Sequence, residues 1–278
     1  MPVASKRSRR CHIVCYLNST LDIVRKLRQV VRVIIQKANA MSGLHIGTSG
    51  WSYDNWSGDF YPEGMSKSNY LEYYVERFNS VEVNATFYRL PFENIVKGWR
   101  NKAHEDFLYS VKGHRRITHY NKLKDIEDNL NHFLSRVRRL GDSLKTVFWQ
   151  FPPSFDKDLD RLKKFIQKLP NDQHFAFEFR DTSWLDEEVY DLLRDNNAAI
   201  VWQSSGEFPD DCTPTADFIY IRFHGLTGYK YSYKESDLKP WAEIIQEHLD
   251  EGRDAQVYFN NAGGNPTESA KMLREMLN

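Results

Sequence analysis

The chain has 278 residues, of which 41% are hydrophobic and 27% charged, and its formal net charge is zero. This composition is typical of a soluble globular protein with one large or two small domains, and no hydrophobic run reaches the roughly 18 residues of a membrane-spanning helix. Three cysteines are too few for a disulfide framework, so we expect a reducing, cytoplasmic environment and no membrane partner.

Positive charge is concentrated at the N-terminus. Residues 1–40 carry nine Lys and Arg residues against one acidic residue, Asp22, so their net charge is +8 and the remaining chain is mildly acidic. An acidic body argues against a protein whose main task is to coat duplex DNA. The helical pattern of Thr20–Ala38 fits a targeting or membrane-surface helix, but Met41 stands just before the first strand pattern. We therefore expect residues 1–40 to be a dispensable or poorly ordered basic extension and residues 41–278 to form the domain.

Strand-like and helix-like segments alternate from residue 44 onward, which is typical of a parallel sheet. Eight strand candidates follow one another, at Leu44–Ser49, Val81–Phe87, Phe107–Gly113, Thr146–Phe151, His174–Arg180, Ala198–Gln203, Phe218–His224 and Ala255–Asn260. Helical patterns follow each strand except the sixth, after which Ser204–Asp217 contains Gly206, Pro209 and Pro214 and should be a loop.

Eight such units within about 240 residues predict an α/β fold, a single (β/α)8 TIM-type barrel. A doubly wound open sheet is the alternative, but it usually has fewer strands, and the sequence contains no Gly-rich dinucleotide-binding loop. It also lacks paired-cysteine, HxH and HExxH patterns, so no metal site and no other cofactor is assigned.

Alternation along the strands predicts which side chains point into the barrel. On the fifth strand, three phenylalanines suit the helix layer, so Glu178 and Arg180 should point inward. The same alternation places polar or aromatic residues inside at the other strand ends, namely Glu82, Asn84, Thr86, Ser110, Lys112, Gln150, Arg222, His224, Tyr258 and Asn260. On the sixth strand, Trp202 and Gln203 could exchange roles.

The polar residues therefore gather at the C-terminal ends of the strands, where barrel active sites lie. Glu178 is a candidate general acid or base, and His224, just before Gly225, a candidate for proton transfer; a lone histidine can also be purely structural. For Glu82, deeper in its strand, we favour a structural ion pair with Arg222 over a role in the site. Buried charge is costly, so stability alone explains this set poorly.

Three basic residues at the same strand ends, Lys112, Arg180 and Arg222, suggest a site for phosphate or carboxylate, since Arg binds such groups bidentately. Neutralisation by the two glutamates is the alternative. The first loop is rich in aromatic residues, which could stack on a base or sugar or pack on one another. They are Trp51, Tyr53, Trp56, Phe60 and Tyr61.

Several short motifs at the strand ends carry a family resemblance. They are Gly47–Tyr53 (GTSGWSY), Val81–Tyr88 (VEVNATFY), Phe151–Pro153 (FPP), Glu178–Arg180 (EFR) with Ser183-Trp184, Arg222–Gly225 (RFHG) and Tyr258–Asn261 (YFNN). From about Leu44 to the C-terminus the chain resembles the YecE-like family, the domain of unknown function 72. The resemblance implies a TIM-type barrel similar in shape to endonuclease IV and sugar isomerase barrels, and it leaves the chemistry open. The segment Val201–Gln203 lacks the acidic residue expected there.

Three functions remain in competition. The first is an enzyme that binds a small anion, such as a phosphorylated sugar or nucleotide, at the barrel mouth. Glu178 and His224 would be its catalytic residues, and its substrate-binding residues would be Trp51, Asn84, Tyr88, Lys112, Gln150, Arg180, Arg222, Tyr258 and Asn260. The second is a nucleic-acid-binding or processing protein, supported by analogy of shape. The third is a non-catalytic barrel that binds a metabolite. The sequence does not indicate an oligomeric state.

Overall fold

The computed structural model describes residues 43–206 and 211–277. The prediction for residues 1–40 lies outside this part of the chain, as do residues 207–210 of the sixth connection. Within the described part, eight parallel strands form one sheet in the order β1-β8-β7-β6-β5-β4-β3-β2. The strands are β1 Leu44–Thr48, β2 Ser80–Val83, β3 Leu108–Lys112, β4 Leu144–Gln150, β5 His174–Glu178, β6 Ala199–Ser205, β7 Phe218–Gly225 and β8 Asp254–Phe259.

The two edges of the sheet, β1 and β2, come together and nearly close the barrel. Ser49 forms an isolated parallel bridge with Glu82, and the Gly50 amide donates to the Glu82 carbonyl oxygen at 2.7 Å. These two contacts bring the edge strands of the sheet together, as a barrel requires. The predicted TIM-type (β/α)8 barrel is therefore confirmed.

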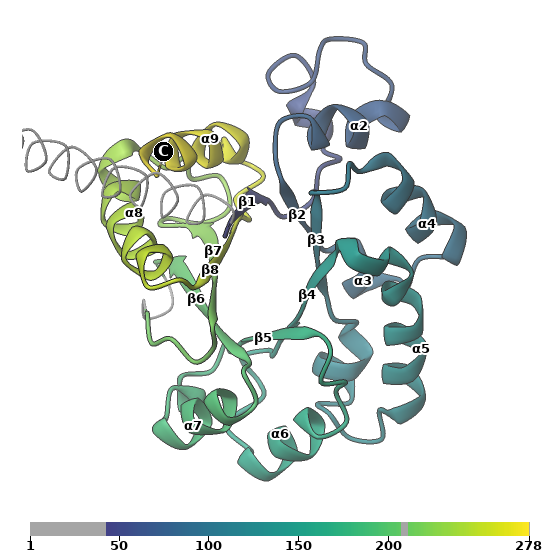
Figure 1. The fold of residues 1–278 in the computed structure, drawn as a ribbon, viewed down its shortest axis with the longest axis vertical. Coiled ribbons are helices and arrows are strands. Elements are labelled where there is room, and N and C mark those ends of the chain that lie inside the picture. Colours follow the sequence, from purple (N-terminus) through teal and green to yellow (C-terminus); the bar gives the residue numbers. More distant parts are fainter. Residues whose placement is uncertain (1–42, 207–210, 278) are drawn as a thin grey trace, which may run out of the picture. The chain divides into compact units, whose positions relative to one another are not determined.

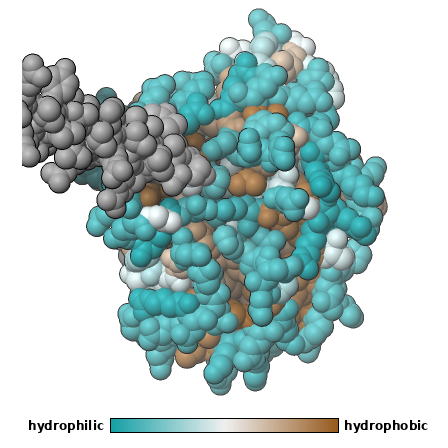
Figure 2. Space-filling model, in the orientation of Figure 1, coloured by the Kyte–Doolittle hydropathy of each residue, from teal (hydrophilic) through white to brown (hydrophobic). Residues whose placement is uncertain are grey.

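Helices surround the ring of strands (Figure 1). They are α2 Tyr70–Val75, α3 Ala85–Tyr88, α4 Glu93–Lys102, α5 Glu127–Val137, α6 Leu159–Ile166, α7 Glu187–Asp195, α8 Glu235–Asp250 and α9 Pro266–Met276. Short turns named η1 to η5 lie between them, of which the π-helical turn η3 spans Arg116–Tyr120. Figure 2 shows mostly hydrophilic residues over these helices and hydrophobic ones in the central part of the face. None of the described helices is long and apolar enough to cross a membrane.

Two apolar layers hold the barrel together, one inside the strands and one between strands and helices. The interior cluster combines large aromatic with small residues, which interlock to fill the tapering space: Phe148, Ala176, Ala199, Val201, Phe218, Tyr220 and Tyr258. On the outer side, Phe177 of β5 meets Phe165 of α6, with ring centroids 6.3 Å apart. Alternation along β5 therefore orients its side chains as expected.

Two strand assignments from the sequence need correction or completion. The second strand ends at Val83, and residues up to Tyr88 coil into α3, where the Thr86 hydroxyl donates to the carbonyls of Val83 (3.1 Å) and Lys112 (2.7 Å). On β6, Val201 belongs to the interior cluster, so Gln203 points inward. Trp202 packs outside against His248 of α8, with a centroid distance of 5.1 Å.

Candidate active site at the barrel mouth

The charged residues predicted to point inward lie together at the C-terminal ends of the strands. Each occupies the last or next-to-last inward position of its strand: Glu82 on β2, Lys112 on β3, Gln150 on β4, Glu178 on β5 and Arg222 on β7. The Glu82, Glu178 and Arg222 side chains are fully buried. We call this set, together with His224 near the end of β7 and with Arg180 and Asn260 just beyond β5 and β8, the mouth cluster.

Arg222 joins the two carboxylates of the mouth cluster. Its Nε and Nη2 donate to Glu82 Oε2 and Oε1, each at 2.8 Å, and its Nη1 donates to Glu178 Oε2. Burial works against the charged guanidinium, but Glu178 and Glu82 outweigh it and raise the pKa of Arg222 above its ordinary value. Every nitrogen of Arg222 is thus engaged within the protein.

Glu82 is saturated with donors. Besides the two bonds from Arg222, its carboxylate accepts hydrogen bonds from Ser49 Oγ (2.5 Å) and Tyr220 OH (2.8 Å). A buried carboxylate with four donors is fully compensated and has no free lone pair directed at a ligand. This geometry supports the structural role that its depth in the strand suggested.

Glu178 lies nearer the opening and is held as an anion. Its carboxylate accepts from Arg222 and Arg180 and, at 2.7 Å, from Gln150 Nε2. Burial alone would raise the pKa of this carboxyl, but Arg180 and Arg222 hold it well below its usual range. Glu178 is therefore ionised throughout the ordinary pH range.

Lys112 is the exception in the cluster because it has no carboxylate partner in the described part of the chain. Its Nζ donates to Gln150 Oε1 at 2.8 Å and lies 4.3 Å from the centroid of the Phe87 ring. Burial, followed by repulsion from Arg222, lowers the pKa of Lys112 to about 7. The amine can therefore gain or lose a proton near neutral pH.

His224 is neutral, and a donor group lies beside each of its ring nitrogens. Burial and then Arg222 hold its pKa well below its usual value. The Arg180 guanidinium lies 2.9 Å from Nε2 and the Asn260 side-chain amide nitrogen lies 3.0 Å from Nδ1. His224 Nε2 is also 3.6 Å from Glu178 Oε1.

Four of the sequence-predicted substrate-binding residues lie outside this cluster. Tyr258 is fully buried in the core, where its hydroxyl pairs with Ser80 Oγ at 2.7 Å. Tyr88 is 64% exposed on α3, and Trp51 packs edge-on against Trp99 at 5.6 Å. Asn84, half-buried before α3, leaves its Oδ1 without a partner among the described residues.

The aromatic first loop is mostly packed on itself. Trp56, Phe60 and Tyr61 are buried, and Tyr61 stacks on Tyr70 of α2 with centroids 3.8 Å apart. Of the two alternatives raised by the sequence, the geometry therefore favours internal packing over a free stacking surface for these three rings.

Near the cluster, sequence reasoning missed one polar residue, His119, and left the orientation of another, Gln203, open. His119, in η3, lies 4.8 Å from the Phe87 ring, and burial with Lys112 lowers its pKa to about 4. Gln203 donates to the Phe179 carbonyl at 3.0 Å while its buried Oε1 has no partner among the described residues. Alternation could have assigned Gln203, but η3 follows no strand periodicity that would have indicated His119.

The amino-acid sequence of the chain matches a known protein family. The model described as "Protein of unknown function DUF72" matches residues 45–278, a range that contains the whole mouth cluster. This chain belongs to the DUF72 family. Among the described residues of this DUF72 chain, no group of three or more His, Cys, Asp and Glu side chains is placed to hold a metal ion.

Relatives of the DUF72 chain include proteins and solved structures. UPF0759 protein YunF of Bacillus subtilis is 24% identical over 84% of this chain and 94% of its own length. UPF0759 protein YecE of Escherichia coli is 30% identical over 49% and 48%. The crystal structure of a DUF72 family protein from Thermotoga maritima has a TM-score of 0.76 and 31% identity, covering 84% of this chain and 98% of that one. A DUF72 structure from Enterococcus faecalis, 20% identical with a TM-score of 0.73, covers 84% and 95% and supports the fold alone.

Proposed function

We propose that this DUF72 protein is an enzyme that binds a small anionic substrate at the barrel mouth and transforms it by proton transfer. The observation that carries the proposal is Lys112, a buried amine that forms no ion pair with a carboxylate of the described chain. Such a lysine is costly to bury, and lysines of this kind serve as general bases or acids. Phosphorylated sugars and nucleotides are the substrate classes that the charge of the site suits.

The geometry favours Lys112 over Glu178 as the group that exchanges the proton. Glu178 is held ionised by Arg180 and Arg222, so it cannot act as an acid near neutral pH. Its role in the proposal is to fix those two guanidiniums and the Gln150 amide that contacts Lys112. Neutral His224, beside Arg180, is the second candidate for direct contact with the substrate.

Charge balance explains why the substrate should be an anion. Two glutamates and two arginines cancel, so protonation of Lys112 leaves the cluster with one positive charge. A bound anion stabilises that protonated form and raises the pKa of Lys112. Arg180 can contribute directly, because its side chain is 24% exposed and its Nη1 and Nε make no hydrogen bond within the described chain. Arg222, in contrast, is fully engaged.

The test is a thermal-shift screen with phosphorylated sugars and nucleotides, followed by product analysis for each ligand that raises Tm. Lys112→Met should abolish turnover while Lys112→Arg keeps ligand binding and loses proton exchange. Glu178→Gln tests the earlier catalytic assignment of Glu178 in the same assay. Full turnover by Lys112→Met would refute the proposal. A ligand that stabilises the protein and is never transformed would favour the non-catalytic barrel instead.

A further inference from the structure

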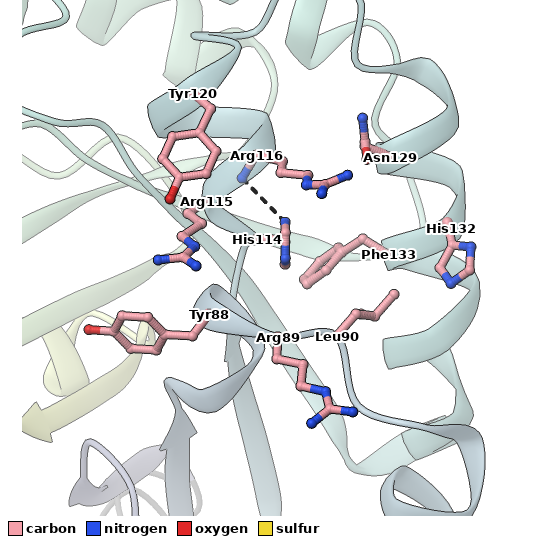
Figure 3. A pocket seen from close by; sticks show the side chains of 10 residues that line it. All are labelled: Tyr88, Arg89, Leu90, His114, Arg115, Arg116, Tyr120, Asn129, His132 and Phe133. Carbon is pink, nitrogen blue, oxygen red and sulfur yellow. Dashed lines mark hydrogen bonds between the residues drawn. The ribbon is translucent and has the colours of Figure 1, made fainter.

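A second concentration of charge lies outside the mouth cluster, in a pocket of about 440 Å³ between the loops that follow β2 and β3. In Figure 3, Tyr88 and Arg89 lie on one side of the pocket, Arg116 and Tyr120 on the other, and Arg115 between the two tyrosines. A cavity of this size accommodates a small organic ligand. The residues that line it include three arginines and no acidic side chain.

The three arginines of the pocket lack the partners that arginines have elsewhere in the described chain. There, only Arg89, Arg100, Arg115 and Arg116 form neither an ion pair nor a side-chain hydrogen bond, whereas arginines such as Arg138, Arg161 and Arg194 pair with carboxylates. Three of these four unpartnered guanidiniums therefore share one cavity. Their donors remain available for a planar, multiply charged oxyanion, which guanidinium groups bind bidentately.

His114 adds a neutral donor to the same pocket. Its Nδ1 accepts a hydrogen bond from the Arg116 backbone N–H at 3.2 Å, so the proton of the neutral ring lies on Nε2. Burial, followed by Arg116 and Arg115, lowers the pKa of His114 and keeps the ring neutral at pH 7. The repulsion that acts on His114 also indicates a positive potential inside the pocket.

Two exposed tyrosine rings lie beside the arginines of the pocket. Tyr88 and Tyr120 are each 64% exposed. The Arg115 guanidinium lies 5.7 Å from the Tyr88 centroid and 5.4 Å from that of Tyr120, so it fixes both rings at the pocket entrance. Such rings stack readily on planar bases.

The pocket is built on a backbone that is held in place. η3 is a π-helical turn, and three non-glycine residues after it have positive φ angles, Lys122 (44°), Leu123 (66°) and Asp125 (47°). Such conformations persist only where surrounding contacts impose them. Lys122 Nζ donates to the Ser154 carbonyl, and Arg161 Nη1 donates to the Lys122 carbonyl at 3.3 Å. The segment that follows η3, next to the pocket, is thus held in place by these contacts.

We propose that this pocket binds the phosphate and the planar base of a nucleotide, with Arg116 on the phosphate and Tyr88 or Tyr120 stacked on the base. A free nucleotide and an unpaired residue of a nucleic acid strand share this chemistry. The site goes beyond the proposed function, because none of its arginines belongs to the mouth cluster. It is a binding site, so its test reads binding and does not require turnover.

The experiment is calorimetric titration of the full chain with AMP, adenosine, inorganic phosphate and a short single-stranded oligonucleotide at fixed ionic strength. Removing the phosphate (adenosine in place of AMP) should weaken binding at least about tenfold, given the usual strength of charge-assisted hydrogen bonds. Arg116→Ala should weaken AMP binding by about tenfold on the same grounds. Arg100→Ala removes an equally unpartnered arginine outside the pocket and should leave the affinity unchanged.

A further variant separates the parts of the proposal. Tyr120→Ala should weaken AMP binding and leave the binding of inorganic phosphate unaffected. Tighter binding of the oligonucleotide with the same dependence on Arg116 would identify a nucleic acid strand as the source and still support the site. Failure to bind either AMP or the oligonucleotide, or equal losses in Arg100→Ala, would overturn it.

Discussion

Lys112 is the residue of the mouth cluster whose protonation state is not fixed by its neighbours at neutral pH. The arginines and glutamates fix one another's charges through direct ion pairs, and His224 is kept neutral by burial. Within the described chain, the Lys112 amine donates to an amide oxygen, lies close to two aromatic rings and forms no ion pair. Its protonation therefore responds to whatever enters the mouth, which makes its titration a direct measure of the site.

That titration has a consequence for stability. The folded-state pKa of Lys112 is lowered from 10.5 to about 7. Between these values the unfolded chain binds a proton that the folded chain has released, so the free energy of unfolding should rise with pH across this window. The contribution should be absent in Lys112→Met. Urea unfolding of both proteins from about pH 7 to about pH 9 measures the difference, and parallel pH profiles would show that the lysine is not perturbed.

The ion pair between Arg222 and Glu82 gives a second prediction for single residues. Glu82→Gln removes one of the two carboxylates that hold a fully buried guanidinium and should lower the free energy of unfolding by about 3–5 kcal/mol. Glu93→Gln is the matched control, because Glu93 pairs with Arg139 at 3.7 Å on the surface and its loss should cost less than about 1 kcal/mol. If urea unfolding shows equal losses of unfolding free energy in the two variants, the burial of the Arg222–Glu82 pair does not make it more costly to break than a surface pair.

At the scale of elements, two glycines should respond in opposite ways to alanine. A Cβ on Gly47 of β1 would lie 2.0 Å from the Ser80 carbonyl oxygen, where β1 meets β2 to close the barrel. A Cβ on Gly98, inside α4, would meet nothing within 4 Å. Gly98→Ala should therefore raise the free energy of unfolding by about 0.5–1 kcal/mol, as expected in a helix interior, whereas Gly47→Ala should lower it clearly. Thermal unfolding of both variants measures these changes in stability. If Gly47→Ala is as stable as the unaltered protein, β1 and β2 can move apart enough to accommodate the added methyl group.

The sequence predicted elements well where a periodic pattern had a single interpretation. The Phe175, Phe177 and Phe179 alternation located the inward face of β5, because successive side chains of a regular strand point to opposite faces. It failed after Val83, where the segment Asn84–Tyr88 has the composition of a strand but coils into α3. There, tertiary hydrogen bonds from Thr86 outweigh local strand propensity.

Alternation along the strands also predicted which mouth residues point into the barrel, but not which residues they contact there. It could not show that Arg222 binds Glu82 with two nitrogens and Glu178 with a third, because those contacts depend on the stagger between strands far apart in the chain. The pocket behind Tyr88 was missed for a related reason. Arg115 and Arg116 lie in a loop and a π-helical turn, which carry no periodic signal, and only the fold brings Arg89 to them.

At the scale of the whole molecule, the described residues contain every strand that the barrel needs. β1 pairs with β8 along its full length from Leu44, and the Gly43 carbonyl already accepts from the Ala255 amide at 2.8 Å. On this basis we propose that residues 41–278 are the folding domain, as the sequence suggested. A chain that starts at Met41 should unfold in one cooperative transition within a few degrees of the full chain, since it retains all paired strands and the interior cluster. Thermal unfolding by circular dichroism measures this, with AMP titration as a check on the pocket. A large loss of Tm, or a broad transition, would place part of the domain before Met41.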